Sequence, residues 1–214
     1  FFAQNKLKKI AAAGGPAMSL CDVCGGFGGS WNRGNVIIFS PGSGGGVAIQ
    51  RIAAAGGIPA DVTRTKGNYK FPVFLPDGRH FLYEVSQESP DRDGIYLSSL
   101  DGSENQRVLP DVSSVVFAPP SGSRIGHLLF IRENNLMAQP IDAGSTQIVG
   151  DAFPVAGEAV FNGADLAPIT VSETGVLLHI SGGGFRSSQI VWLDRAGKLL
   201  GLVAGPGNLI DPSI

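Results

Sequence analysis

The sequence predicts an all-β chain that forms a β-propeller of four-stranded antiparallel blades. Three observations support this fold class: a repeat of about 43 residues, a high glycine content, and apolar runs of strand length that alternate with turn signals. Glycine accounts for 31 of the 214 residues, whereas charged residues make up only 16%. Because glycine destabilises helix interiors and serves tight turns, this composition favours short strands over helices.

The repeat is visible in the apolar residue that precedes each predicted turn. These residues are 43, 43, 54 and 43 positions apart and are Trp31, Phe74, Phe117, Val171 and Ile214. A second series of apolar residues repeats at a similar spacing, and we call the members of both series anchors. The second series is Ile10, Ile52, Leu100, Ile141 and Leu193. Units of this length are typical of propeller blades. The one long unit has its surplus between Ile141 and Val171, where we expect the stretch GDAFPVAGE (150–158) to be an insertion.

Each repeat contains four predicted strands, which are clearest in residues 69–111. We expect them at Phe71–Phe74, His80–Val85, Ile95–Leu100 and Gln106–Leu109. Pro76, Asp77 and Gly78 form the turn between the first two strands, since proline fixes φ and glycine adopts a positive φ without strain. The turn glycines of the other repeats are Gly34, Gly122 and Gly175.

The second strand of each repeat is an almost unbroken apolar run, as in VIIF (36–39), HLLFI (127–131) and VLLHI (176–180). Such runs are typical of strands that are buried on both faces. The third strand shows more alternation of apolar and polar residues, so we expect it to be an outer strand of the blade.

We expect one propeller domain over residues 1–214, with blade repeats at 25–68, 69–111, 112–158 and 159–207. Residues 1–24 supply three strands of a further blade, and residues 208–214 supply one. Pairing of the two chain ends would therefore close a five-bladed ring and remove exposed sheet edges. The alternative is an open arc of a six- or seven-bladed ring.

The charge pattern excludes some classes of partner. The net charge is −2 and the isoelectric point is about 5.9, so no basic field is present to attract nucleic acid. No apolar run approaches the roughly 18 residues of a membrane span, and no signal peptide is visible. The chain opens on FFAQNKLKKI, which resembles the middle of a strand, and we expect it to be part of a longer protein.

The cysteines, histidines and glycine runs have structural interpretations. Cys21 and Cys24 form a single CxxC motif, which we interpret as a local disulfide or two loop thiols, because zinc requires four ligands. His80, His127 and His179 stand at different distances from their turn glycines, so we expect core or edge histidines and no shared metal. The glycine runs at 42–46 and 181–184 fit hairpin loops better than phosphate loops, which precede helices. We expect no cofactor.

Residues 86–94 form the longest polar loop between a second and a third strand. A rigid scaffold holds such loops in place, so this loop is a candidate contact surface, with Gln87, Glu88, Asp91, Arg92 and Asp93 as its candidate residues. The segment DRDG (91–94) faintly resembles a calcium loop but lacks the remaining acidic ligands and the distal glutamate. The remaining turn residues, Pro76, Asp77, Gly78, Gly122 and Gly175, are expected to be structural.

Three stretches resemble known propellers. FPVFLPDGRHFLY (71–83) resembles the TolB-like (WD40-like, PD40) repeat, whose hallmark is an SPDG-type turn. HLLFIRENNLMAQPIDAG (127–144) and QIVWLDRAGKLLGLVAGPGNLIDPSI (189–214) are similar to the C-terminal propeller of bacterial serine/threonine protein kinases of the acidobacterial type. That resemblance implies a membrane-anchored protein whose propeller lies outside the cytoplasm as a sensor or interaction module.

The functional prediction is a non-catalytic module that binds a protein, a peptide or a small molecule. The sequence has no kinase glycine loop, HRD or DFG motif and no GxSxG elbow, so kinase or peptidase activity would belong to another domain. One alternative is the gating propeller of a prolyl-oligopeptidase-like hydrolase. A second alternative is a propeller lyase or hydrolase with a metal in its channel. Fold alone does not decide among these functions.

Overall fold

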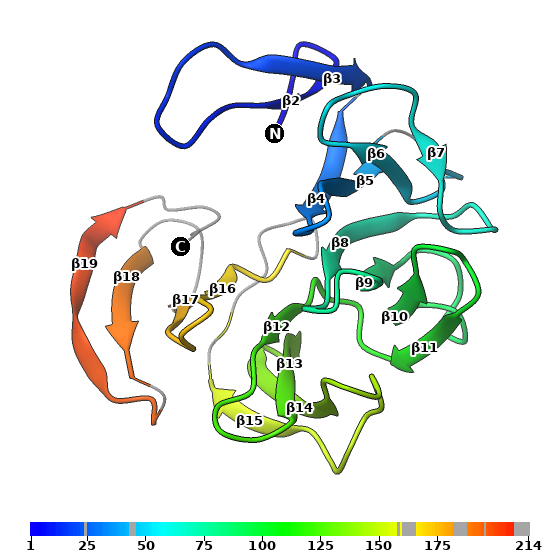
Figure 1. The fold of residues 1–214 in the computed structure, drawn as a ribbon. Coiled ribbons are helices and arrows are strands. Elements are labelled where there is room, and N and C mark those ends of the chain that lie inside the picture. Colours follow the sequence, from blue (N-terminus) through cyan, green and yellow to red (C-terminus); the bar gives the residue numbers. More distant parts are fainter. Residues whose placement is uncertain are drawn as a thin grey trace. The chain divides into compact units, whose positions relative to one another are not determined.

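The computed structural model describes residues 1–23, 25–42, 46–157, 159, 166–181, 188–194 and 196–207. Over these residues the secondary structure consists of strands and turns, in one three-stranded and four four-stranded sheets (Figure 1). Every strand pair in them is antiparallel. The prediction of an all-β chain with four-stranded antiparallel units is therefore confirmed. No helix that could cross a membrane is found in this part of the chain.

The sheets follow one another along the chain. The first consists of β1 (Phe2–Ala3), β2 (Lys6–Lys9) and β3 (Met18–Asp22). The second consists of β4 (Gly26–Trp31), β5 (Val36–Pro41), β6 (Gln50–Ala53) and β7 (Ala60–Asp61). The third consists of β8 (Tyr69–Phe74), β9 (His80–Val85), β10 (Gly94–Ser99) and β11 (Asn105–Leu109). The fourth consists of β12 (Val116–Ala118), β13 (Ile125–Arg132), β14 (Asn135–Asp142) and β15 (Phe153–Ala156). The fifth consists of β16 (Ile169–Val171), β17 (Leu177–Ser181), β18 (Ser188–Leu193) and β19 (Leu199–Gly207).

The chain divides into two compact units, residues 1–110 and residues 111–214. The first unit contains the first three sheets, and the second unit contains the fourth and fifth. The three N-terminal strands match the three predicted for residues 1–24. The strand predicted near Ile214, on which ring closure depends, lies outside the described residues, and five-bladed closure stays a prediction.

The second strand of each four-stranded sheet has the burial that its apolar run predicts. All six residues of β9 are buried, and so are the four central residues of β5. Each of these strands has a hydrogen-bonded neighbour on both sides, and its side chains alternate between two covered faces. A continuous apolar run is therefore the correct sequence signal for this strand.

The expectations about the outer part of the blade hold only in part. The third strand alternates between buried and more exposed positions in β6 and in much of β14, as expected, whereas β10 is buried at five of its six positions. In each four-stranded sheet the outermost strand is the fourth one, such as β11. The stretch at 150–158 is not simply an insertion, because it contains β15, the fourth strand of its sheet. Exposed fourth strands have no apolar pattern. The spacing of the repeats therefore shows that one repeat is longer than the others, but it does not show where the extra residues lie.

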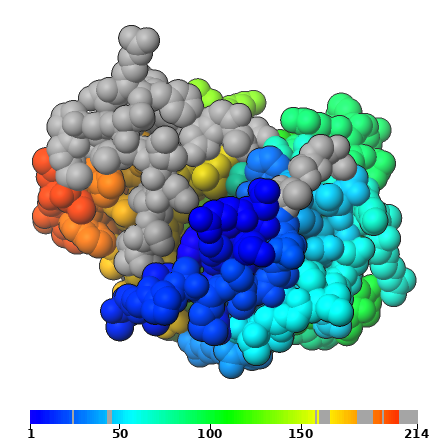
Figure 2. Space-filling view, turned by 90° about the horizontal axis from the view of Figure 1, so that it is seen from above, coloured from blue at the N-terminus to red at the C-terminus, as the bar shows by residue number. Residues whose placement is uncertain are grey.

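The core of the first unit lies between neighbouring sheets. Seven buried residues join the second sheet to the third: Ile38, Ile49, Val62, Tyr69, Phe81, Tyr83 and Val85. A further cluster joins the first sheet to the second through Leu7, Leu20, Ile37, Phe39, Ile52 and Ala54. Figure 2 shows the N-terminal residues, in dark blue, packed directly on the segment that follows them. One face of the second strand therefore packs on the preceding sheet.

Polar contacts also join the second and third sheets. The Asn32 side chain donates to the carbonyl of Gly78 over 2.7 Å, and the amide of Phe74 donates to Ser30 Oγ over 3.2 Å. The Ser40 hydroxyl donates to the carbonyl of Tyr69. These bonds join side chains of the second sheet to backbone groups of the third sheet and of the turn after β8.

The second unit has an equivalent core between the fourth and fifth sheets. It contains the buried residues Leu129, Ile131, Leu136, Ala138, Ala159, Ala167 and Ile169. Two buried serines precede β12 and support it: Ser113 Oγ accepts from the amide of Ile131 over 3.0 Å, and Ser114 Oγ accepts from the amide of Ala167 over 2.7 Å. The second unit is therefore also built by sheet-on-sheet packing.

Replacement of Phe81 by alanine should lower the free energy of unfolding by about 3–5 kcal/mol, because it leaves a cavity between two sheets. Ile58→Ala is the control: Ile58 belongs to the same unit and is 95% exposed, so its loss should change stability by less than about 0.5 kcal/mol. Urea denaturation followed by circular dichroism measures the free energy of unfolding of both variants and of the wild type. Equal effects of the two substitutions would contradict the packing described here.

Candidate functional site

The turn between β8 and β9 is shaped by one aspartate and one glycine. Asp77 Oδ1 accepts the backbone N–H groups of Arg79 and His80 at 3.0 and 2.9 Å. Gly78 has a φ of 67°, which is the left-handed conformation, and its amide donates to the carbonyl of Leu75. The sequence thus needs Asp at position 77 and Gly at position 78 to reverse the chain.

The other turns show the same chemistry with different residues. Gly122 and Gly175 have φ values of 72° and 81°. In the turn after β4, however, the residue with positive φ is Asn35, at 58°, and not Gly34 as the glycine rhythm suggests. Asn adopts this conformation more readily than most residues. The spacing of the turn glycines therefore predicts the position of this turn correctly, but the residue with positive φ is the one after Gly34. Asn32 Oδ1 accepts the amide of Val36, much as Asp77 serves its own turn.

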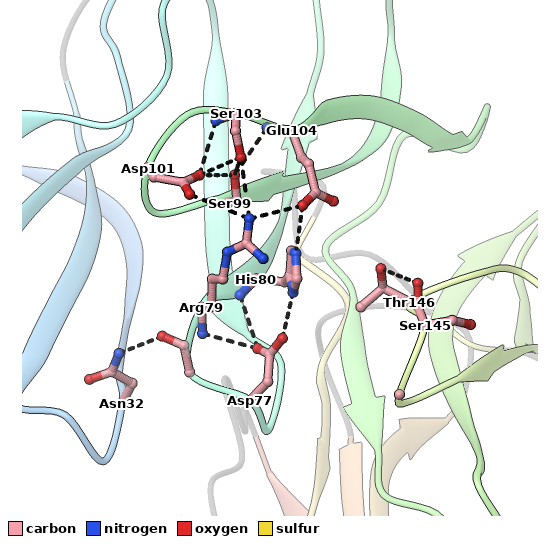
Figure 3. Close-up of polar contacts among 12 residues, drawn as sticks. Asn32, Asp77, Arg79, His80, Ser99, Asp101, Ser103, Glu104, Ser145 and Thr146 are labelled. Carbon is pink, nitrogen blue, oxygen red and sulfur yellow. Dashed lines mark hydrogen bonds and ion pairs between the residues drawn. The ribbon is translucent and has the colours of Figure 1, made fainter.

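His80 joins this turn to the turn between β10 and β11 (Figure 3). Its Nδ1 lies 2.5 Å from Asp77 Oδ2, and its Nε2 lies 3.2 Å from Glu104 Oε1. Burial alone would lower the pKa of His80, but the two carboxylates outweigh burial and raise it. Burial would raise the pKa of Asp77, but the hydrogen bonds from His80 and Arg79 lower it.

The second half of this cluster surrounds Asp101. Its Oδ1 accepts the hydroxyls of Ser99 and Ser103, both at 2.6 Å, and these bonds lower the pKa of its carboxyl group. Arg79 contacts Asp101 at 3.3 Å and Glu104 at 3.1 Å (Figure 3). Both serine hydroxyls thus donate to Asp101, while the two nitrogens of His80 face Asp77 and Glu104. The residue types are those of a hydrolase triad, but their hydrogen bonds form a clamp between two turns.

The 86–94 loop lies at the other end of the same sheet, between β9 and β10. Asp93 Oδ1 accepts the backbone N–H groups of Glu88 and Ser89 at 2.9 and 3.3 Å, and the amide of Asp93 returns to the carbonyl of Ser89. Gln87 adopts a left-handed φ of 62° and is exposed. One aspartate therefore closes the loop, as an Asx turn does.

Further contacts hold the outer part of the loop. Arg92 pairs with Glu88 at 3.2 Å, and Arg107 on β11 donates to the carbonyls of Pro90 and Asp91 at 3.0 and 3.2 Å. The hydroxyl of Tyr96 donates to the carbonyl of Arg92. The loop is consequently ordered by its own hydrogen bonds while Gln87, Glu88, Asp91 and Arg92 remain at the surface.

The other histidines and Cys21 have different surroundings. His127 on β13 and His179 on β17 both line a pocket in the second unit, and burial lowers the pKa of each. Cys21 lies half-buried on β3, and burial, aided by the charge of Asp22, raises the pKa of its thiol, so it is not an activated thiolate. Cys24 and most of both glycine runs lie outside the described residues, and the described part of the chain contains no cluster of three potential metal ligands.

No protein-family model matches the sequence, and no curated protein matches it. Among solved structures, TolB from Acinetobacter baumannii is similar with a TM-score of 0.66 and 14% identity, over 92% of this chain and 48% of TolB. A structure of a nidogen/laminin complex gives a TM-score of 0.54 and 14% identity, over 82% of this chain and 64% of the other. Prolyl oligopeptidase B from Galerina marginata gives 0.52 and 11%, over 82% of this chain and 26% of the enzyme.

These similarities define the class of the chain: its fold is a β-propeller. More particularly, its blades are TolB-like, and the chain spans about half the length of the TolB structure. The predicted fold class is thereby confirmed.

The three histidines should titrate in a fixed order. In an NMR titration of the imidazole signals, His80 should have a pKa above 6.5, and His127 and His179 should have pKa values below it. Because the folded pKa of His80 is raised, its contribution to stability is complete below about pH 6.5 and is lost as the pH rises through the folded pKa. Glu104→Gln should lower the pKa of His80 and leave that of His127 unchanged. A pKa of His80 at or below that of His127 would contradict the clamp.

Proposed function

We propose that this chain is a non-catalytic binding module, a propeller segment of a larger protein, which recognises a protein or peptide through the 86–94 loop. The observation that carries this proposal is that the loop is exposed and yet ordered by Asp93 and Arg107 before any partner binds. A preorganised loop loses little conformational entropy on binding, so its contacts contribute more fully to affinity. The clamp around His80 supports this proposal, because it joins two turns of the sheet that carries the loop and so makes that sheet a rigid scaffold.

The charges of the loop indicate the chemistry of the partner. The carboxylate of Asp93 closes the loop, and Glu88 pairs with Arg92. Asp91 is exposed, and only its backbone carbonyl serves the loop, through Arg107. Asp91 thus presents a negative charge from a fixed backbone. A partner surface with lysine, arginine or N–H donors fits it best.

We further propose that the whole protein is a receptor-like bacterial kinase with this propeller outside the cytoplasm as its sensor. The support is the resemblance of residues 127–144 and 189–214 to kinase-associated propellers. The second candidate is the gating propeller of a prolyl-oligopeptidase-like hydrolase. It is favoured by the similarity to two prolyl endopeptidase structures, of which the chain covers 26% and 28%.

The coding sequence on both sides of this segment should separate the two candidates. We expect a kinase domain and a membrane span upstream, as the resemblance to kinase-associated propellers implies. Sequencing the complete gene is the measurement. An adjacent α/β-hydrolase domain would overturn the kinase proposal in favour of the peptidase, and it would leave the loop proposal open to its own test.

Charge reversal in the loop should weaken binding of the partner. Asp91→Arg should reduce the affinity at least about tenfold, because it places a positive charge opposite the cationic surface that we expect on the partner. Asp151→Arg is the matched control, since Asp151 is also an exposed aspartate but lies in the second unit. A partner captured by the wild-type chain is then titrated against all three proteins by calorimetry. Equal affinities for the wild type and Asp91→Arg would eliminate the loop as the contact surface.

A further inference from the structure

A pocket of about 430 Å³ lies in the second unit between the fourth and fifth sheets. Its walls are mainly apolar and include Leu129, Ala138, Phe153 and Leu177. Two histidines line the pocket, His127 from β13 and His179 from β17, and Asp194 is the single acidic side chain among the described lining residues. The volume falls in the range of small-molecule sites, roughly 300–1,000 Å³.

Strand register explains why this junction is hollow. In the third sheet, Phe81 pairs with the anchor Phe74, and Tyr83 follows two positions later on the same face of β9. In the fifth sheet, Leu177 pairs with the anchor Val171, and His179 follows at the same spacing on β17. Phe81 and Tyr83 are at most 1% exposed and fill the junction of the first unit. A leucine and an imidazole replace these two rings in the second unit and leave space that close packing otherwise fills.

The position of His179 is aromatic in the other three four-stranded sheets. The equivalent residues, found from the same strand pairing, are Phe39, Tyr83 and Phe130, and each is buried to 1% exposure or less. A polar ring at a position that otherwise holds a core aromatic is an unfavourable choice for stability alone. The histidine at this position is explained if a bound ligand, and not a neighbouring side chain, forms a hydrogen bond with its imidazole.

His179 has an unsatisfied polar atom at this site. The residue is 6% exposed, and its Nδ1 is buried without a hydrogen-bond partner. Burial lowers the pKa of His179 more than a hydrogen bond of the ring with the Ile180 backbone raises it, so the ring is neutral near pH 7 and has one donor and one acceptor. Leaving a buried polar atom unpaired costs about 1–3 kcal/mol.

His127 offers a second neutral imidazole. Its ring meets Phe153 edge to face, with 5.8 Å between the ring centroids, and burial lowers its pKa. By strand pairing it corresponds to His80, because each precedes the residue that pairs with the anchor. His80 has two carboxylate partners, whereas Asp194, the one acid that lines the pocket, accepts the amides of Ala196 and Lys198 in its own turn.

We infer that this pocket binds a small, uncharged aromatic compound with one O–H or N–H donor, such as a phenol or an indole. The aromatic ring would occupy the space that Phe81 and Tyr83 fill at the equivalent junction, against Leu177 and Phe153. The donor would bond to a histidine nitrogen. Anions are disfavoured, because no lysine or arginine is among the described lining residues. Apolar cavities of smaller volume are known to bind benzene.

The test uses p-cresol, which is the side chain of tyrosine, with toluene and benzoate as comparison probes. Imidazole NMR signals should shift saturably with p-cresol for His127 and His179, while His80 in the first unit serves as the internal control. Toluene should bind about fivefold more weakly than p-cresol, because a neutral hydrogen bond contributes about 1 kcal/mol. Benzoate should bind at least about tenfold more weakly. Absence of saturable shifts at millimolar p-cresol, or equal affinities for the three probes, would overturn the proposal.

Two variants connect the binding to the pocket. His179→Phe restores the aromatic core residue, so it should reduce p-cresol binding at least about tenfold and raise the melting temperature. Leu200→Phe, at a residue that is 62% exposed, adds the same side chain outside the pocket and should bind like the wild type. Phe153→Leu is an independent test of the pocket if His179→Phe does not fold. Phe153 is 46% exposed, and its replacement by leucine should weaken p-cresol binding about fivefold. Wild-type affinity in both pocket variants would refute the site.

This site is independent of the proposed loop function. Asp91→Arg changes the first unit and should leave p-cresol binding unchanged, and His179→Phe should leave binding of a protein partner unchanged. Failure of one proposal is therefore distinguishable from failure of the other.

Discussion

Within each unit, one face of a second strand packs against the preceding sheet, and most of the described structure depends on this contact. In the first unit, Ile37 and Phe39 of β5 cover the first sheet, and Phe81 and Tyr83 of β9 cover the second. The opposite face of β5 contributes Ile38 to the next junction. Because side chains alternate along a strand, a single apolar run can serve two junctions. This arrangement requires strict register, since a slip of one residue would exchange the two faces.

The turns preserve that register. The strand β9 enters from a turn in which Asp77 satisfies two amides, and His80 ties that turn to Glu104 on the other hairpin of the sheet. Adjacent antiparallel strands place this clamp at one end of the sheet and the 86–94 loop at the other. The ion pairs in the clamp are largely exposed, so their direct contribution to stability is small. Their effect is to fix the geometry of two turns, which lets the opposite loop project from a rigid base.

The sequence predicted what depends on local pattern. The bounds of β9 were predicted to the residue, because burial on both faces and a Pro-Asp-Gly turn act together there. The fourth strands are harder to predict: the expected insertion at 150–158 contains β15, because exposed residues such as Phe153 and Val155 have no periodicity imposed by a core. The left-handed residue of the first complete turn was misplaced because Asn35 and Gly34 both tolerate that conformation. Polarity and length predict the loop at residues 86–94, but they do not predict that Asp93 closes it, because the aspartates of this loop are equivalent in sequence.

The repeat and turn patterns of the sequence do not predict the pocket, although the sequence contains a signal for it. The distance of each histidine from its turn glycine does not reveal which histidines are equivalent, because the turns differ in length. Counted from the residue that pairs with the anchor, His80 and His127 share one position and His179 stands where Phe39, Tyr83 and Phe130 stand. Although His80 and His127 share this position, their pKa values shift in opposite directions: carboxylates raise the pKa of His80, and burial lowers the pKa of His127. Register thus decides which junction a side chain enters, and the neighbours across that junction decide what the side chain does. A histidine in an otherwise aromatic row is for this reason a signal of a binding site only when, as for His179, a buried ring nitrogen finds no hydrogen-bond partner among the described residues and the ring lines a pocket.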